Sequence, residues 1–478
     1  MALWGLIDGL FSTVVSILLL LTVVLTIVVV VLDNRNPVKT LAWVLVLTFL
    51  PVVGLVFYYF FGRDVRKEKL ISKKGYFRLV KYPLAEYYQQ KSFACPEGQH
   101  QLMRFFRNVN GALPFEGNEI QIYGTGAEML QALLKAIANA THHIHLQSYI
   151  IEDDAVGKIV RDALIERASK GVEVRLLYDD VGCWKVKHEF FDEMRGAGIE
   201  TRAFLKVRFP RFTSKVNYRN HRKIIVIDGR VGFVGGMNIA LRYLKGVSWG
   251  VWKDRHMRIE GHAVYGLQTA FLADWYAADH SLITSSVYFP EMNMKGDALV
   301  QIVTSNPIGG VGGIMQGVLL AITASRKYFY VQTPYLLPTE PILVALKTAA
   351  LAGVDVRVMI PERADSSITH WASLSYVDEL LEAGVKIYRY KKGFLHAKLM
   401  VSDDILSTLG STNMDFRSFE HNFEVNAFMY DRNSALQLKD AFCSDQKDAE
   451  LLSLKEWRTR PWYQKVMESV IRLFAPLL

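Results

Sequence analysis

The chain has 478 residues, of which 51% are hydrophobic and 22% are charged. This length exceeds what one hydrophobic core usually needs and predicts two or three domains, and the composition excludes a disordered chain. A formal net charge of +9 predicts an anionic partner, either nucleic acid or an acidic membrane surface. The three cysteines (Cys95, Cys183 and Cys443) are widely separated with no C-x-x-C spacing, so neither a zinc site nor a disulfide framework is expected.

Two apolar runs open the chain. Leu10–Leu32 carries no charge and is long enough to cross a bilayer as a helix, and Leu41–Phe61 is also uncharged. The polar residues between the runs favour a turn, so residues 1–62 are predicted to form a transmembrane hairpin with two spans. A cleaved signal peptide fits poorly, because no basic stretch precedes the first run and a second run follows at once. The other alternative is one span plus a shallow or re-entrant segment, since Pro51 and Gly54 interrupt the second run.

Basic residues follow the second run, in a segment predicted to be a juxtamembrane linker over residues 63–110. Eight lysines and arginines lie between residues 63 and 81, whereas the turn between the runs holds few. The positive-inside rule therefore places everything after Phe61 in the cytoplasm. The same cations could lie against anionic headgroups, each contributing about 1 kcal/mol. Near the C-terminus, aromatic and aliphatic residues from Trp457 to Phe474 alternate with cations, which is typical of an interfacial helix or of a helix that packs on the protein's own body.

The rest of the chain reads as a duplicated α/β pattern, with one copy in residues 111–285 and the other in residues 286–478. In the first copy a strand at residues 143–149 is followed by a helix and a second strand at residues 172–177. In the second copy, residues 328–333 and 354–359 repeat that order around another helix. Two βαβ-rich halves related by duplication are the expected fold.

Each copy carries the same polar motif at the same internal spacing. H-x-K is followed by four residues, an aspartate, six residues and G-[GS]-x-N. The first copy supplies His221, Lys223, Asp228, Gly236 and Asn238. The second copy supplies the corresponding residues His396, Lys398, Asp403, Ser411 and Asn413. A pattern of this length that occurs twice is a strong indication of a functional site.

These side chains suit phosphodiester chemistry. Histidine and lysine two residues apart on a strand point to the same face, where the lysine can hold a phosphate oxygen. Asn238, Asn413 and Ser411 can donate hydrogen bonds to the same phosphoryl group. An imidazole near neutral pH can act as a nucleophile or as an acid, so two histidines can divide these tasks. The chemistry requires no metal or other cofactor, and the sequence shows no zinc or magnesium signature.

The two motif aspartates, Asp228 and Asp403, are included in the catalytic set. An orienting or structural role for both is favoured over direct proton transfer. After the second motif, Glu420 and Asn422 could also reach the substrate.

At these residues the sequence resembles the phospholipase D superfamily and, within it, the family of bacterial cardiolipin synthases. Further stretches that carry the resemblance are residues 220–223, 235–238, 333–335, 393–398 and 413–418. The resemblance implies an α/β fold of two mixed sheets flanked by helices, related by a pseudo-two-fold axis, with one active site between the halves. It implies transfer of a phosphatidyl group between two phosphatidylglycerol molecules at the bacterial cytoplasmic membrane, with release of glycerol. It further implies that His221 is the nucleophile and His396 the acid and base, although the near-equivalent motifs leave that order open.

Other candidate features are weaker. His142, His143 and His145 alternate on an expected strand and are read as core or surface residues. Residues 309–313 are glycine-rich but lack the lysine of a phosphate-binding loop, which indicates a flexible connection. A basic run precedes the first motif and either guides anionic headgroups or forms a solvated loop: Lys206, Arg208, Arg211, Lys215 and Arg219.

The motif alone leaves three enzymatic functions open. These are a lipid phosphatidyltransferase, a hydrolytic phospholipase D that uses water as acceptor, and a membrane-tethered nuclease or other phosphodiesterase. The apolar hairpin, the C-terminal segment and the family resemblance favour a phospholipid substrate over nucleic acid. The identity of the second lipid and the oligomeric state do not follow from the sequence.

Overall fold

The computed structural model describes residues 2–32, 37–62, 84, 95–207, 217–307 and 312–478. The chain divides into a smaller unit, residues 1–67 with 207–217, and a larger unit, residues 68–206 with 218–478. Most of the expected basic linker, residues 63–83 and 85–94, lies outside the described residues. The same holds for Arg208, Arg211, Lys215 and residues 309–311.

The smaller unit contains one long apolar helix, α1 (Ala2–Leu32). Its stretch Leu10–Leu32 has a mean hydropathy of 3.3. Among the described residues it is the one helix long and apolar enough to cross a membrane, although an N-terminal signal sequence would satisfy the same criteria.

The second apolar run is broken into shorter helices. α2 (Pro37–Phe49) has 13 residues, and α3 (Pro51–Phe57) and a π-helical turn (Tyr58–Gly62) follow it. A helix of 13 residues is about 20 Å long, shorter than the roughly 30 Å hydrocarbon core of a bilayer. The chain bends so tightly that a Cβ on Gly54 would lie 2.9 Å from the Val46 carbonyl oxygen. The second run is therefore not one straight span, and the expected pair of spans is not confirmed.

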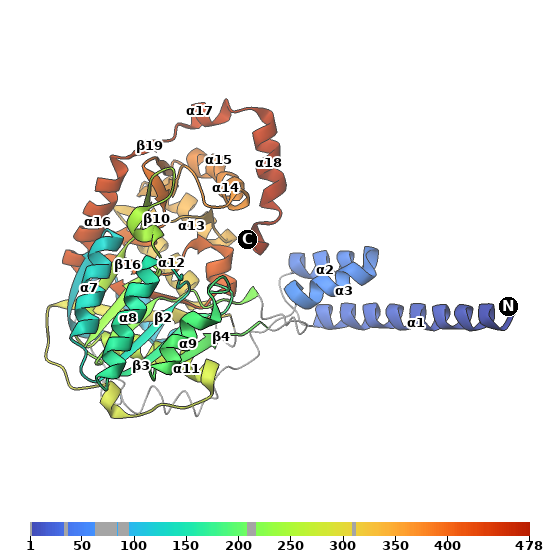
Figure 1. Ribbon diagram of the computed structural model, residues 1–478. Coiled ribbons are helices and arrows are strands. Elements are labelled where there is room, and N and C mark those ends of the chain that lie inside the picture. The colour runs from blue at the N-terminus through green and yellow to red at the C-terminus, as the bar shows by residue number, and fades with distance from the viewer. Residues whose placement is uncertain (1, 33–36, 63–83, 85–94, 208–216, 308–311) are drawn as a thin grey trace. The chain divides into compact units, whose positions relative to one another are not determined.

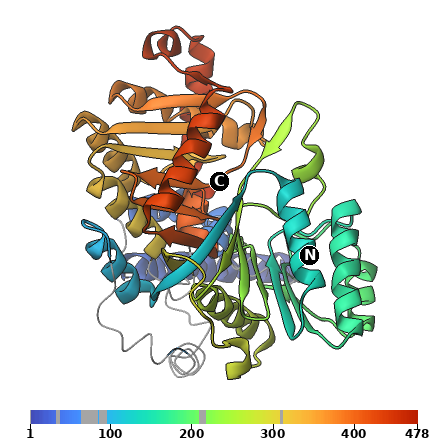
Figure 2. The same ribbon diagram turned by 90° about the vertical axis from the view of Figure 1, so that its left-hand side faces the viewer.

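The larger unit is built on a single 15-stranded sheet (Figures 1 and 2). The strands of its first half are β1 (Pro114–Tyr123), β2 (His143–Ser148), β3 (Glu173–Asp179), β4 (Glu200–Phe204), β5 (Ile224–Ile227), β6 (Val231–Gly235) and β8 (His256–Glu260). Those of its second half are β9 (Ala298–Ser305), β10 (Tyr328–Gln332), β12 (Asp355–Pro361), β13 (Lys386–Tyr390), β15 (Leu399–Ser402), β16 (Leu406–Gly410), β18 (Glu424–Met429) and the edge strand β19 (Ala449–Leu451).

The strand order shows the duplication directly. It reads β19-β13-β12-β10-β15-β16-β18-β9-β1-β8-β6-β5-β2-β3-β4, so each strand from β13 to β9 has a counterpart from β4 to β1 in mirrored order. In both halves three strands run parallel and the remainder antiparallel. The two mixed sheets expected from the resemblance are thus present, but they join edge to edge.

The join is the antiparallel pairing of β1 with β9. The register shifts between Phe115 and Asn118, and the Asn118 amide fills the irregularity by donating to the carbonyls of Phe115 (2.7 Å) and Ala298 (3.0 Å). Its Oδ1 accepts from the amide of Ala263 at 2.7 Å. A buried side chain at the bulge therefore satisfies backbone groups that the broken ladder leaves without partners.

Helices flank both halves of the sheet. The first half carries α7 (Gly126–Ala138), α8 (Ala155–Ser169), α9 (His188–Gly196), α10 (Arg242–Lys245) and α11 (Val264–Asp279). The second carries α12 (Gly313–Ala324), α13 (Glu340–Leu351), α14 (Ser367–Leu374), α15 (Val377–Glu382) and α16 (Arg432–Gln446), and α6 (His100–Asn110) packs on α12. Sequence signals set their starts: Thr125 and Glu128 form a capping box on α7, and Asp154 caps α8.

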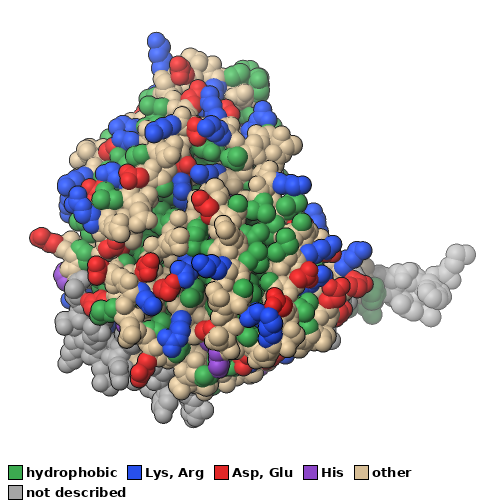
Figure 3. All heavy atoms as spheres, turned by 60° about the vertical axis from the view of Figure 1, so that its left-hand side comes forward, with side chains coloured by type: hydrophobic (Ala, Val, Ile, Leu, Met, Phe, Trp, Pro, Cys, Tyr) green, Lys and Arg blue, Asp and Glu red, His purple; other side chains and the backbone are tan. Residues whose placement is uncertain are grey.

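Charge is dispersed over the face that Figure 3 shows. On the face shown in Figure 3, lysines and arginines alternate with aspartates and glutamates, and apolar side chains lie between them. The net charge is therefore not gathered into one continuous basic surface on that face.

Candidate active site

The backbone of each motif is hydrogen-bonded to the other half of the sheet. The amide of His221 donates to the carbonyl of Phe423 at 3.0 Å, and the amide of Phe423 donates to Arg219 at 2.9 Å. Likewise the amide of His396 donates to the carbonyl of Lys253 at 2.7 Å. The last contact extends a small parallel ladder between β7 (Val251–Lys253) and β14 (Gly393–Leu395). These contacts bring the two H-x-K motifs into one site.

Each histidine is held by a carboxylate from the opposite half. His221 Nδ1 lies 3.0 Å from Glu424 Oε1, and His396 Nδ1 lies 2.6 Å from Asp254 Oδ2. All four side chains are buried, with 9% of His221 and 7% of His396 exposed. Because each Nδ1 is engaged by a carboxylate, Nε2 is the nitrogen left to meet a substrate, as in other acid–histidine pairs.

The two carboxylates occupy equivalent places in the duplicated fold. Gly235 pairs with His256 and Gly410 with Asn426, and each acid lies two residues before that partner. Sequence reasoning missed Asp254 and gave Glu424 no role. The motif search could not find the pair at one spacing, because Asp254 follows Gly235 by nineteen residues and Glu424 follows Gly410 by fourteen.

This arrangement explains why the first motif has Gly236 where the second has Ser411. A Cβ on Gly236 would lie 2.2 Å from Asp254 Oδ1, so glycine is the residue that leaves room for this carboxylate. At the equivalent place the hydroxyl of Ser411 donates to Glu424 Oε2. Ser411, expected to contact phosphate, is thus bound to the carboxylate that orients His221.

Burial keeps both imidazoles neutral. It lowers the pKa of His221 to about 4, a shift that Glu424 opposes. It also lowers the pKa of His396 to about 3, with Lys398 acting in the same direction and Asp254 against it. In the free protein both rings are therefore unprotonated at neutral pH, and one of them must take up a proton when the anionic substrate is bound.

The two motif lysines are buried beside the histidines. Lys223 Nζ donates to the carbonyl of His221 at 2.6 Å and lies 5.3 Å from the centre of the Tyr149 ring. Lys398 Nζ donates to the carbonyl of His396 and lies 2.8 Å from Nδ1 of the same ring. Burial lowers the pKa of Lys223 to about 7 and that of Lys398 to about 8. A phosphate anion between them would stabilise the charged forms.

Asn238 and Asn413 hold the loops that border the site. Asn238 Oδ1 accepts from the amide of Ile150 at 3.1 Å, and its Nδ2 donates to the Tyr243 hydroxyl at 2.8 Å. Asn413 Nδ2 donates to Asp415 Oδ2 at 3.0 Å. Burial raises the pKa of Asp415 to about 6.

Two further candidates, Glu420 and Asn422, follow the second motif, and Asn422 belongs to this network. Asn422 Nδ2 donates to Glu424 Oε1 at 3.2 Å. Glu420 lies half-buried in a π-helical turn (Arg417–His421).

The motif aspartates lie at the other end of the strands from the histidines. Asp228 accepts from the amides of Thr141 (2.8 Å), His142 (2.8 Å) and His143 (2.9 Å), just where β2 begins. The four residues of β5, about 13 Å of strand, lie between it and His221. It also has a positive φ of 53° and starts the β5–β6 turn.

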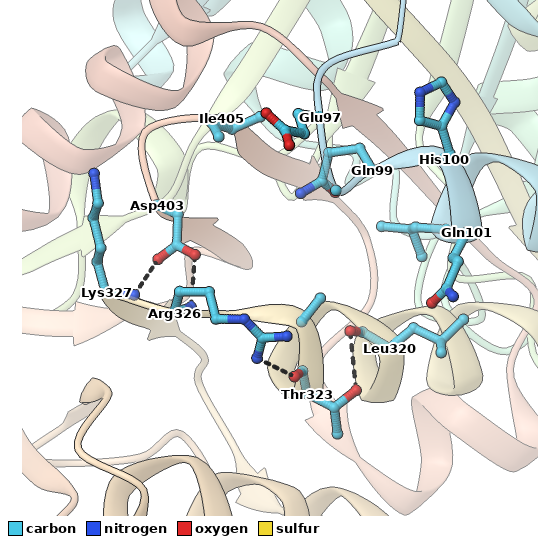
Figure 4. Close-up of a pocket in the computed structure, with 13 residues that line it drawn as sticks. Glu97, Gln99, His100, Gln101, Leu320, Thr323, Arg326, Lys327, Asp403 and Ile405 are labelled. Atoms are coloured by element: carbon cyan, nitrogen blue, oxygen red, sulfur yellow. Dashed lines mark hydrogen bonds between the residues drawn. The ribbon is translucent and has the colours of Figure 1, made fainter.

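Asp403 repeats that role in the second half, as Figure 4 shows. It accepts from the amides of Arg326 (2.7 Å), Lys327 (2.9 Å) and Tyr328 (2.9 Å), and its φ is 55°. The carboxylate also borders a pocket of about 610 Å³ between the end of α12 and the start of α6. The structure therefore does not bring either aspartate to the reacting groups, and their sequence-based inclusion among the catalytic residues is not supported by the geometry.

The remaining candidates contact other side chains of the fold. Arg219 is buried, and its Nη1 lies 3.6 Å from Asp179 Oδ1. His143 and His145 are buried on β2, where Gln268 lies within hydrogen-bond distance of both rings (3.2 and 2.8 Å). Within the described residues no group of three or more histidine, cysteine, aspartate or glutamate side chains could hold a metal ion.

Comparison with known proteins identifies related chains. Residues 133–248 and 318–446 match the family model described as "Cardiolipin synthase, PLD-like domain", and residues 20–63 match "Phospholipase_D-nuclease N-terminal". The chain is 42% identical to a cardiolipin synthase of Geobacillus sp. (strain WCH70), over 97% of this chain and 93% of the relative. It is 38% identical to the major cardiolipin synthase ClsA of Bacillus subtilis (strain 168), over 98% and 99%.

A solved structure supports the fold. The phosphatidylserine synthase of Haemophilus influenzae Rd KW20 superposes with a TM-score of 0.58 at 15% identity, over 79% of this chain and 98% of that chain.

Proposed function

The chain belongs to the cardiolipin synthase family of phospholipase D-like enzymes, and from this we propose that it joins two phosphatidylglycerol molecules into cardiolipin and releases glycerol. The observation that carries the proposal is the crossed arrangement of histidines and carboxylates, His221 with Glu424 and His396 with Asp254. Two orientable imidazoles in one buried site are what a two-step exchange at phosphorus requires.

In the first step Nε2 of His221 attacks the phosphorus of one phosphatidylglycerol. The bond from phosphorus to the glycerol oxygen breaks, and His396 Nε2–H gives its proton to that oxygen. The products are free glycerol and a phosphatidyl group bonded to His221. Lys223 and Lys398 balance the phosphate charge, and Glu424 stabilises the cationic ring of His221.

In the second step the neutral His396 removes the proton from the glycerol hydroxyl of another phosphatidylglycerol. The resulting oxygen attacks the phosphorus, the bond to His221 breaks, and cardiolipin is formed. Water entering in place of the alcohol would give phosphatidic acid, so the acceptor decides between transfer and hydrolysis. The reverse assignment of the two histidines is chemically equivalent and is distinguished by which residue carries the label in a trapped intermediate.

We further propose that the chain lies in the bacterial cytoplasmic membrane with its larger unit in the cytoplasm. The apolar helix α1 supports membrane association. The second apolar run would be a second membrane segment, made of the two short helices α2 and α3. The excess of basic residues after Phe61 supports the orientation.

The proposal is tested by incubating the purified chain with phosphatidylglycerol vesicles and identifying the products by mass spectrometry. Cardiolipin together with an equal amount of glycerol is expected. Phosphatidic acid as the only product would replace the transferase with a hydrolase. With ³²P-labelled phosphatidylglycerol and a rapid acid-free quench, label on His221 is expected, and label on His396 would reverse the two roles.

A further inference from the structure

The C-terminal helix α18 (Trp462–Arg472) leaves an apolar face uncovered. It follows α17 (Leu454–Arg458) and runs along the outside of the larger unit next to α14 and α15 (Figure 1). The exposed apolar side chains of this face, here called the α18 face, are Trp462, Tyr463, Val466, Met467, Val470, Leu473 and Phe474.

The opposite side of the helix is fastened to the protein. Arg460 donates to both carboxylate oxygens of the buried Glu468, at 2.6 and 3.1 Å. Arg472 donates to Glu379 Oε1 at 2.6 Å and to the carbonyl of Ser375 at 3.1 Å. In the structure these contacts hold the polar side of α18 against α15 and the segment before the helix, and the apolar side chains face outward.

A short series of contacts links α18 to the candidate active site. α18 packs on α14, whose Ser373 hydroxyl accepts from the amide of Leu336 at 3.1 Å. Leu336 and Leu337 form β11, which pairs with β17 (Met414–Asp415) directly after Asn413. α18 is therefore connected through α14, β11 and β17 to the segment that carries Ser411 and Asn413.

The composition of the segment matches a lipid surface. Residues 452–478 contain five lysines and arginines and two glutamates. Arg458, Arg460 and Arg472 are ion-paired with carboxylates, so the cations outside these pairs are Lys455 and Lys465. Tryptophan and tyrosine at the start of α18 have amphipathic rings that favour the headgroup level, and cations beside an apolar helix face favour anionic lipids.

We propose that the α18 face docks onto the anionic membrane surface and holds the active-site edge of the second half against the lipid from which the substrate comes. This inference rests on the proposed lipid substrate. The polar contacts of Glu468 and Arg472 would set the depth, since only the exposed side of the helix can enter the lipid.

The docking is tested with a fluorescent probe on the full chain reconstituted in vesicles of phosphatidylglycerol and brominated phosphatidylcholine. A nitrobenzoxadiazole label is attached at Leu473→Cys or, as a control, at Leu351→Cys, with Cys95 and Cys443 replaced by serine. The two leucines are similarly exposed, at 77% and 73%, and Leu351 is the last residue of a different helix, α13. Quenching by bromine several-fold stronger at position 473 is expected. Equal quenching, or a blue-shifted but unquenched label that indicates a protein partner, would overturn the proposal.

Activity gives the second readout. The double variant Val466→Asp/Leu473→Asp is compared with Val344→Asp/Leu351→Asp, which has the same residue types, the same spacing and nearly the same exposures (50% and 77% against 49% and 73%). We expect the first pair to lower cardiolipin formation on vesicles about tenfold and the second pair to leave it within twofold. An equal effect of both pairs would overturn the proposal. Wild-type protein that makes no cardiolipin would refute the proposed function, whereas the quenching result stands independently of turnover.

Discussion

At the scale of single residues, the site depends on side chains exchanged between the halves. His221 is oriented by Glu424 of the second half, and His396 by Asp254 of the first. Burial alone would raise the pKa of both acids. For Asp254 the charge of Lys398 and the hydrogen bond with His396 hold the pKa below its ordinary value, and for Glu424 the contact with His221 does the same. Both carboxylates are therefore ionised and can stabilise an imidazolium when it forms.

Removing the charge of either acid while keeping its shape should impair the chemical step. Glu424→Gln and Asp254→Asn are each expected to lower kcat by about 10²- to 10⁴-fold with a small change in KM, because the amide no longer stabilises the protonated ring. Steady-state kinetics on phosphatidylglycerol vesicles measure the effect. Because Glu424 raises the pKa of His221, its removal should also shift the acid limb of the pH profile to lower pH. A variant with unchanged kcat would exclude the orienting role.

At the scale of elements, the two motif aspartates close equivalent hairpins. Asp228 and Asp403 both adopt positive φ, start a β-turn, and accept backbone hydrogen bonds from the beginning of the neighbouring strand. The same side chain thus fixes a turn and the start of β2 or β10. These hydrogen bonds give a structural reason for an aspartate at the same spacing in both motifs.

Loss of such an aspartate should affect stability more than catalysis. Asp403→Ala leaves three backbone amides without an acceptor and is expected to destabilise the fold by about 1–3 kcal/mol. Thermal unfolding of the purified variant measures this, and kcat of the folded fraction should stay within a few-fold of wild type. A large fall in kcat with an unchanged melting temperature would instead indicate a direct chemical role.

The histidines of β2 should make stability depend on pH. Burial lowers the pKa of His143 to about 3 and that of His145 to about 4, whereas an unfolded histidine titrates near 6.5. The unfolded state therefore binds more protons, so the stabilisation is present above pH 6.5 and is lost as pH falls toward 4.

Replacing one of these rings should make that dependence shallower. His145→Gln removes one titrating group and is expected to reduce the slope by up to about 1.4 kcal/mol per pH unit between pH 6 and 4.5. Urea unfolding at a series of pH values measures the slope. His188→Gln, at an exposed position, serves as the control and should leave it unchanged. Identical slopes for wild type and His145→Gln would contradict the buried neutral state.

At the scale of the whole molecule, the duplication produces one site from two motifs. The sheet continues from one half into the other through β1 and β9, and the cross-half contacts at Phe423 and Lys253 align the motifs. Neither half contains both a histidine and the acid that orients it. The repeated unit is therefore not an independent catalytic module.

Because both motifs come from the same chain, inactive variants should not rescue one another. His221→Ala and His396→Ala are each expected to lower cardiolipin formation by at least about 10²-fold while the protein stays folded, as circular dichroism would check. Mixing the two purified variants should give no more activity than either alone. Recovered activity would mean that the halves exchange between chains.

The sequence by itself determined the duplicated α/β fold, the principal strands of both halves, the first apolar helix and the paired H-x-K motifs. These features are local: they depend on hydrophobic period, on a charge-free run and on fixed spacing within one stretch of chain. The predicted strands at residues 143–149 and 328–333 accordingly agree with β2 and β10 to within one residue.

Only the tertiary structure decided which side chains meet. The partners of the histidines lie 203 and 142 residues away in the chain, at unequal distances from their motifs, so no spacing rule could find Glu424 and Asp254. The Asp228 and Asp403 carboxylates turned out to bind backbone amides because the hairpin geometry points them away from the histidines. The break in the second apolar run falls at Pro51, which the sequence had indicated together with Gly54 as an interruption, and the structure adds the close packing of Gly54 on Val46.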